Sequence, residues 1–220
     1  MTDEIIDKLT AQANELHFAE NLPAEINGFT LKKIFAPDED KFIFFTCADD
    51  KIHCELKIYF HTETNEFKVC QRIGLTEFCL TKFFTQDFAR FKELFDAEIE
   101  LVLKNLRDVH CVKLNRFLRE KKIDTWTYSS ELPATLEGFE LFITPVTPVE
   151  VTNGSFIVIN YADYALKSDF AIHYNIYTDE FSGEARINNA PHVTYAFDDL
   201  KGRIQKSLSH IRGVPWGPSD

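Results

Sequence analysis

The chain has 220 residues, of which 24 are Lys or Arg and 35 are Asp or Glu, so its formal charge is −11. Apolar residues make up 45% of the chain and aromatic residues 14%, mostly as 21 Phe. This length suffices for a packed core without a metal or disulfide, the aromatic content excludes a disordered chain, and the negative charge argues against general nucleic-acid binding.

No apolar run approaches the roughly 18 residues that a membrane-spanning helix needs. The sequence begins Met1-Thr2-Asp3-Glu4, without the basic and then apolar pattern of a signal peptide. The five cysteines are odd in number and show no C-x-x-C spacing, which favours reduced thiols over a disulfide framework. We therefore expect a cytoplasmic protein with no membrane span.

The first half of the chain reads as a helix followed by strands. A helix is expected at the start, where apolar residues recur on one face at Ile5, Leu9, Ala13 and Leu16. Alternating patterns then predict strands over 29–35, 41–47, 52–62 and 67–73, with a fifth near 77–83. The first of these strands should end before Pro37. A turn at 48–51 would place Cys47 opposite Ile52 and Phe45 opposite Cys54.

The middle of the chain is predicted to be helical. No Gly or Pro occurs between Gly74 and Pro133, and apolar residues keep near-helical spacing from Phe88 to Phe117. The pattern predicts a long helix around 87–122, either continuous or kinked near Arg107. Strands follow in the second half, including 181–187 and 192–196, and a closing helix is expected over 197–211.

The two halves share an internal repeat. Residues 22–31 and 132–141 are identical at six of ten positions, at an offset of 110. Residues 42–73 and 156–187 are identical at ten of 32 positions, at an offset of 114. Because the matches keep their order, we interpret the chain as a tandem duplication of units 1–107 and 108–220.

The predicted fold class is α+β. Each unit should contain an antiparallel β-sheet of four to five strands, flanked by N- and C-terminal helices. This order of elements resembles that of secretion-chaperone-type α+β domains. The resemblance concerns the order of elements alone, and a fold does not by itself give a function.

The common catalytic and ligand-binding motifs are missing from the sequence. No two of the eight glycines are separated by one residue, so there is no dinucleotide-binding or Walker loop. His53 and Cys54 would point to opposite faces of a strand, and no C-x-x-C or H-E-x-x-H metal site is present. We predict no catalytic residue, no cofactor and no metal.

Charged pairs have simple structural interpretations. Glu66 with Arg72, and the equivalent Glu180 with Arg186, are read as turn and surface residues, with a structural ion pair as the alternative. The basic cluster Arg116, Arg119, Lys121 and Lys122 suits the C-terminal end of a helix, with an anionic partner as the alternative.

The outer faces of the sheets are the predicted interaction surface. Strict alternation places aromatic and polar residues at matching positions on the faces away from the core: Phe42, Phe44, Tyr59, His61, Phe156, Val158, His173 and Asn175. Burying a Phe stabilises a fold by roughly 1.5–3 kcal/mol, so something should cover this face. The cover is either the protein's own helices, the other unit, a homodimer or a protein partner.

Three functions remain open. The first is a non-enzymatic binding or adaptor protein, which exposed outer aromatics would support and sealed ones would not. The second is a small-molecule sensor or enzyme with a pocket between the repeats, where Tyr59, His61, His173 and Asn175 are aligned candidates. The third is an acidic immunity or inhibitor-type protein, whose negative charge would steer it to a basic target.

Overall fold

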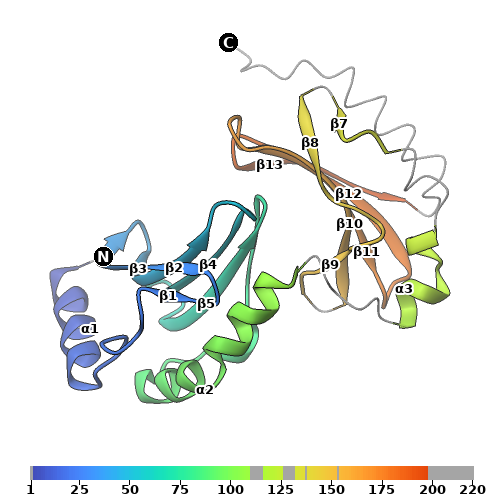
Figure 1. Cartoon of the computed structure of the whole chain (residues 1–220). Helices are drawn as coiled ribbons and strands as arrows, with labels where there is room; N and C mark the ends of the chain where they lie inside the picture. The colour runs from blue at the N-terminus through green and yellow to red at the C-terminus, as the bar shows by residue number, and fades with distance from the viewer. Residues whose placement is uncertain (1, 110–115, 126–131, 137, 153, 198–220) are drawn as a thin grey trace, which may run out of the picture. The chain divides into compact units, whose positions relative to one another are not determined.

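The computed structural model describes residues 2–109, 116–125, 132–136, 138–152 and 154–197. The chain divides into two compact units, residues 1–109 and 110–220, and each is described by itself. Both units are α+β with an antiparallel sheet, as the sequence predicts (Figure 1). None of the helices in the described part of the chain has the length and apolar character that a bilayer crossing requires.

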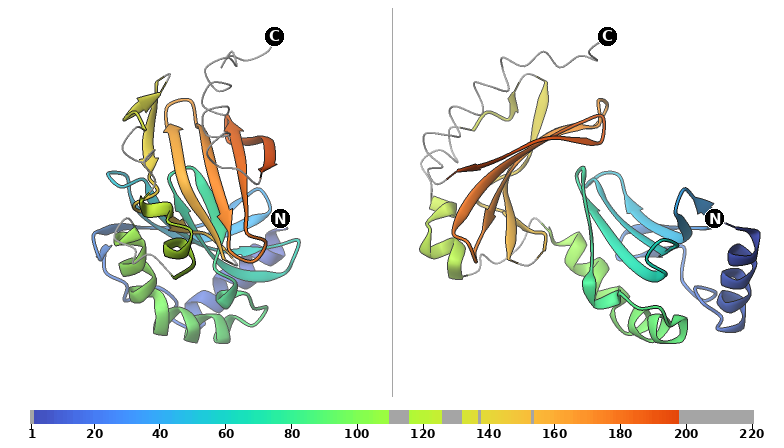
Figure 2. Two further views of the ribbon diagram at one scale, coloured as in Figure 1. Left: turned by 90° about the vertical axis from the view of Figure 1, so that its right-hand side faces the viewer. Right: turned by 180° about the vertical axis from the view of Figure 1, so that it is seen from behind.

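Unit 1 is a six-stranded antiparallel sheet in the order β1-β2-β3-β4-β5-β6. Its elements are, in chain order, α1 (Asp3–Glu15), β1 (Glu25–Ile26), β2 (Phe29–Asp38), β3 (Lys41–Asp49), β4 (Cys54–His61), β5 (Glu66–Ile73), β6 (Thr76–Cys79), a 3-10 turn η1 (Thr81–Phe83) and α2 (Phe88–Arg107). The sheet has one strand more than predicted, because Glu25 and Ile26 pair with the start of β2. α2 lies along one face of the sheet (Figure 2).

Strand β2 runs through Pro37, where the sequence predicted an end. Pro37 pairs with Phe42 of β3, and β1 reaches only Thr30 on the other side of β2. Proline is tolerated there because its missing N–H falls on an edge. The hairpin between β3 and β4 is also wider than predicted, since Cys47 lies opposite Leu56 instead of Ile52.

A β-bulge in β3 decides which side chains reach the core. The pairing of β3 with β4 shifts register between Ile43 and Phe45, so the alternation of faces is broken at Phe44. Phe42, Phe44 and Phe45 are all fully buried. The ring of Phe44 lies 5.2–6.1 Å from the rings of five others, namely Phe18, Phe35, Phe42, Phe67 and Phe88. Strict alternation had placed Phe42 and Phe44 on the outer face, and this assignment is wrong.

Helix α2 is positioned by its sequence at both ends. Asp87 caps its start, because the carboxylate accepts hydrogen bonds from the backbone N–H groups of Ala89 and Arg90 at 2.9 and 3.2 Å. At its end Arg107 donates hydrogen bonds to the Asn27 carbonyl at 3.0 Å and to the Asp49 carboxylate at 2.5 Å. These bonds fasten the helix to two turns of its own sheet.

Unit 2 is a seven-stranded sheet in the order β13-β12-β11-β10-β8-β7, with β9 paired to β10, and thus exceeds the four to five strands predicted. Its elements are α3 (Arg116–Glu120), η3 (Ile123–Thr125), β7 (Thr135–Leu136), β8 (Phe139–Ile143), β9 (Val149–Glu150), β10 (Ser155–Asp163), β11 (Ser168–Asn175), β12 (Glu180–Ile187) and β13 (Ala190–Phe197). Strand β10 carries a register shift between Ile157 and Ile159 in its pairing with β11. Phe156, Val158 and Ile159 therefore join one buried cluster with Leu118 and Ile123.

Two expected helices need comment. Residues 87–122 do not form one continuous helix, because α2 ends at Arg107 and α3 is a separate short helix. The closing helix predicted over 197–211 lies outside the described residues, apart from Phe197 at the end of β13.

Candidate functional site

The eight predicted interaction residues do not form one exposed surface, because four of them are buried. Phe42, Phe44, Phe156 and Val158 are 0%, 0%, 2% and 0% exposed, and their neighbours belong to the core of their own unit. The bulges in β3 and β10 are the physical reason, since each turns an expected outer residue inward. The aromatic argument for a binding surface is therefore lost at these four positions.

Tyr59 lies on the face of the unit 1 sheet opposite α2 but is itself only 4% exposed. Its hydroxyl lies 3.2 Å from Cys70 Sγ and 3.3 Å from Cys79 Sγ. The Lys41 ammonium lies 5.3 Å from the centre of its ring. Burial, together with the charges of Glu77 and Asp40, raises the pKa of Tyr59 to about 12. Tyr59 is therefore a neutral, packed residue.

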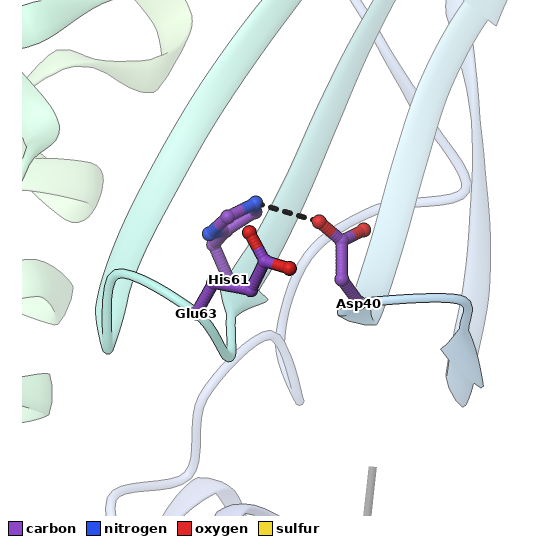
Figure 3. A group of neighbouring side chains, drawn as sticks. All are labelled: Asp40, His61 and Glu63. Carbon is purple, nitrogen blue, oxygen red and sulfur yellow. Dashed lines mark ion pairs between the residues drawn. The ribbon is translucent and has the colours of Figure 1, made fainter.

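His61 takes part in the one cluster of potential metal ligands found among the described residues. It groups with Asp40 and Glu63, and one ligand atom from each lies within 4.8 Å of the others (Figure 3). His61 ends β4, Asp40 lies in the β2–β3 turn, and Glu63 lies in the β4–β5 turn. Because β3 and β4 are antiparallel neighbours, these two turns meet at the same end of the sheet.

Hydrogen bonds hold this cluster in place. His61 Nε2 lies 2.8 Å from Asp40 Oδ2. Thr62 fixes the Asp40 turn, since its backbone N–H and its hydroxyl both donate to the Asp40 carbonyl, at 2.9 and 2.8 Å. The backbone N–H of Thr64 donates to His61 Nδ1 at 3.3 Å, and Thr64 Oγ1 lies 3.1 Å from the same nitrogen. Nδ1 therefore accepts, and Nε2 carries the proton that it donates to Asp40.

Sequence reasoning found His61 but missed Asp40 and Glu63. The signal was present, because both acidic residues occupy turns that the predicted strands place at one end of the sheet. What the sequence did not give was the pairing register that brings the two turns together.

A groove lies on the face of the unit 1 sheet opposite α2, with a volume of about 780 Å³. Its lining includes residues that lie opposite one another on neighbouring strands. Thr30 and Lys32 of β2 lie opposite Ala48 and Thr46 of β3, and Thr46 lies opposite Lys57 of β4. Charged side chains dominate its lining: Glu25, Lys32, Asp38, Asp49, Asp50, Lys51, Glu55 and Lys57. Carboxylates thus outnumber ammonium groups in it by five to three.

The corresponding face of unit 2 carries a buried polar network instead. Asn160 donates a hydrogen bond to Asp169 at 2.9 Å, and Arg186 lies 3.9 Å from Asp169 and 3.5 Å from Glu184. His173 lies 3.7 Å from Glu184. Burial raises the pKa of Asp169 against the opposing effect of Arg186, and burial likewise lowers the pKa of His173.

Asn175 is the last of the four predicted site residues of unit 2, and it closes a turn. Its side-chain oxygen accepts hydrogen bonds from the backbone N–H groups of Tyr177 and Thr178, at 2.8 and 3.2 Å. The offset of 114 places Thr178 at the position of Thr64 and Asn175 at that of His61. The asparagine therefore accepts the turn hydrogen bond that His61 Nδ1 accepts in unit 1.

The cysteines only partly follow the prediction of reduced thiols. Cys70 and Cys79 face each other across β5 and β6 and form a disulfide, which corrects that expectation for this pair. Cys47 and Cys54 are free and buried, and burial raises the pKa of both thiols to about 12. They are core residues without the thiolate character that a nucleophile or metal ligand needs.

The predicted ion pairs have other partners than expected. Arg72 pairs with Glu55 at 3.2 Å, and Glu66 pairs with Lys68 at 3.1 Å. Arg72 and Glu55 are directly opposite on β5 and β4, whereas Glu66 lies at the far end of β5. In the basic cluster, Lys121 pairs with Asp179, which uses one of its charges within the unit.

No protein-family model matches this chain, and no curated protein or solved structure is significantly similar to it. Its function therefore has to be inferred from the chemistry of its own surfaces.

Proposed function

We propose that the chain is a non-enzymatic binding protein built by tandem duplication of one α+β unit. The bulges in β3 and β10 support a duplication, because they fall at Phe44 and Val158, which the offset of 114 aligns. The cross-strand pair of Arg72 with Glu55 and that of Arg186 with Asp169 obey the same offset. Features of backbone geometry that coincide in this way favour common ancestry over chance.

The groove on unit 1 is the observation that carries the binding function. The opposite face of the same sheet is filled by α2 and by Phe18, so that face is core. The groove face instead presents charged and polar side chains over three strands. Such a surface suits a charged protein partner, because complementary charges steer two proteins together and fix the register of their complex.

The expected partner presents a basic segment. Two of the five groove carboxylates, Asp49 and Glu55, are paired with Arg107 and Arg72, which leaves Glu25, Asp38 and Asp50 as the acidic groups that a partner would meet. The whole chain carries a charge of −11. A field of that sign accelerates encounters with a cationic surface and slows them as salt is added. The acidic groove would therefore both bind the partner and attract it electrostatically.

The test compares two charge-matched variants in affinity capture from native lysate. Asp38→Lys/Asp50→Lys reverses two groove charges, and Glu4→Lys/Asp7→Lys makes the same net change on exposed positions of α1. We expect at least one protein to be captured by the wild type and the α1 variant but not by the groove variant. That protein should then bind the purified chain directly, with an association rate that falls as salt rises.

The proposal fails if no protein distinguishes the groove variant from the α1 variant. Mass spectrometry of the same eluates also detects bound small molecules. A metabolite that is retained by the wild type and the α1 variant but lost with the groove variant would identify a small-molecule sensor and overturn the protein-binding function.

A further inference from the structure

We propose that Asp40, His61 and Glu63 bind one divalent transition-metal ion, with Zn²⁺ as the probe. This site is separate from the groove in function, so it stands or falls independently of the proposed protein partner. Imidazole nitrogen together with carboxylate oxygen is a donor set that Zn²⁺ accepts readily. The nitrogen donor also disfavours Mg²⁺ and Ca²⁺, which prefer oxygen alone.

The three ligands converge because of the fold. Asp40 and Glu63 are in turns of neighbouring hairpins and His61 ends β4, and Figure 3 shows their three side chains converging at this end of the sheet. One ligand atom from each already lies within 4.8 Å of the others. Glu63 is the exposed member of the three, whereas Asp40 and His61 are half-buried. Three protein ligands would leave a coordination position open.

Metal binding by His61 requires a change of tautomer that Thr64 can accommodate. Binding of the ion through Nε2 requires that nitrogen to lose its proton, so the proton of the neutral ring must move to Nδ1. Nδ1 then gives up the hydrogen bond that it accepts from the Thr64 backbone N–H, and Thr64 Oγ1, 3.1 Å away, can accept the new Nδ1–H hydrogen bond in its place. Orientation of the second ring nitrogen in this way is typical of metal-bound histidines. Asp40 is likewise fixed, because Thr62 holds the carbonyl of the same turn residue with two hydrogen bonds.

Unit 2 supplies the most useful variant. The positions that correspond to Asp40, His61 and Glu63 are Gly154, Asn175 and Tyr177, so the ligand set is present in unit 1 alone. Asn175 shows that asparagine accepts the turn hydrogen bond at this position, from the N–H of Thr178 at 3.2 Å. His61→Asn should therefore keep the turn intact while it removes Nε2.

A matched control is offered by His17. His17 Nδ1 lies 3.0 Å from Glu20 Oε2 in an exposed pair that has no third ligand among the described residues. Its φ of 51° suits asparagine, which tolerates the left-handed region, so His17→Asn should also fold. The two variants thus remove one histidine each, one from a three-ligand cluster and one from a simple pair.

The experiment is a titration of the full chain with Zn²⁺ in competition with a chromophoric chelator. We expect one Zn²⁺ per chain at this site, equal affinity for wild type and His17→Asn, and an affinity lower by about tenfold or more for His61→Asn. Asp40→Asn and Glu63→Gln should also weaken binding, and an excess of Mg²⁺ should not displace the ion. Circular dichroism checks that each variant is folded.

Three results would overturn the site. The first is the absence of Zn²⁺ binding by the folded wild type. The second is equal affinity of wild type and His61→Asn, which would place the ion elsewhere. The third is an equal loss for His17→Asn and His61→Asn, which would indicate weak association with any surface histidine. None of these results depends on whether the groove variant loses its partner.

Discussion

The bulge places Phe44 in the core, so truncation of its side chain should lower the stability of unit 1 strongly. Strict alternation, which places Phe44 on the outer face, predicts a much smaller loss. Phe44 is fully buried, and its ring contacts five other aromatic rings. A buried Phe removes about 150–250 Å² from water, which at about 25 cal/mol/Å² is worth about 4–6 kcal/mol as an upper value. Measured Phe→Ala changes in cores cost about 3–5 kcal/mol, and we expect a loss in that range for Phe44→Ala.

The matched control is Phe84→Ala. Phe84 is 38% exposed, and the Lys68 ammonium lies 4.9 Å from the centre of its ring. Its truncation removes a surface contact and should cost about 1 kcal/mol or less. The two variants therefore remove the same side chain from a core position and from a surface position of one unit.

Urea unfolding followed by far-UV circular dichroism measures the difference. We expect Phe44→Ala to lower the midpoint of the circular dichroism transition by far more than Phe84→Ala. Equal losses for the two variants would refute the inward position of Phe44, because an outer-face Phe should be as dispensable as Phe84.

Three further predictions follow from single contacts. Arg107→Ala should lower the free energy of unfolding by about 1–2 kcal/mol, because it removes the hydrogen bonds from the end of α2 to Asn27 and Asp49. An unchanged urea midpoint would contradict this. Reduction of the denatured chain should expose two more cysteines to alkylation, and equal alkylation with and without reductant would exclude the disulfide. Cys70→Ser/Cys79→Ser should lower the free energy of unfolding by about 2–3 kcal/mol, because the disulfide closes a loop between residues nine positions apart. Burial raises the pKa of Asp169 above its ordinary value of 3.8, so its contribution to stability is present below that pH and is lost as pH rises through the folded pKa. Asp169→Asn should keep the hydrogen bond from the neighbouring amide and remove this loss, so the stability gained over wild type should grow with pH in urea titrations; a difference that shrinks with pH would show the opposite shift.

Much of the fold could be predicted from local patterns. The apolar stripe at the start gave α1, and the alternating stretches gave the long strands of both sheets, because these periods depend on residues close in the chain. The two-residue strand β1 was missed, because a strand of that length has no period of its own. The end of α2 at Arg107 was uncertain for a related reason, since no Gly or Pro marks it.

The candidate site shows where local reasoning stops. His61 was placed on the outer face by alternation, and the structure keeps it there, close to Asp40 and Glu63. Phe44 was placed on the same face and lies in the core. The difference is the bulge between Ile43 and Phe45, which reverses the phase of β3 but leaves that of β4 unchanged.

By itself, then, the sequence determined the α+β class, the antiparallel strands and the acidic, aromatic composition, because each follows from composition or from neighbours along the chain. The tertiary structure alone decided that Phe42 and Phe44 are core and that Cys70 meets Cys79. It also brought Asp40 and Glu63 to His61. These outcomes depend on the register between strands, and a shift of one residue exchanges the two faces of a sheet. That register is set by packing across the whole unit, which no short stretch of sequence encodes.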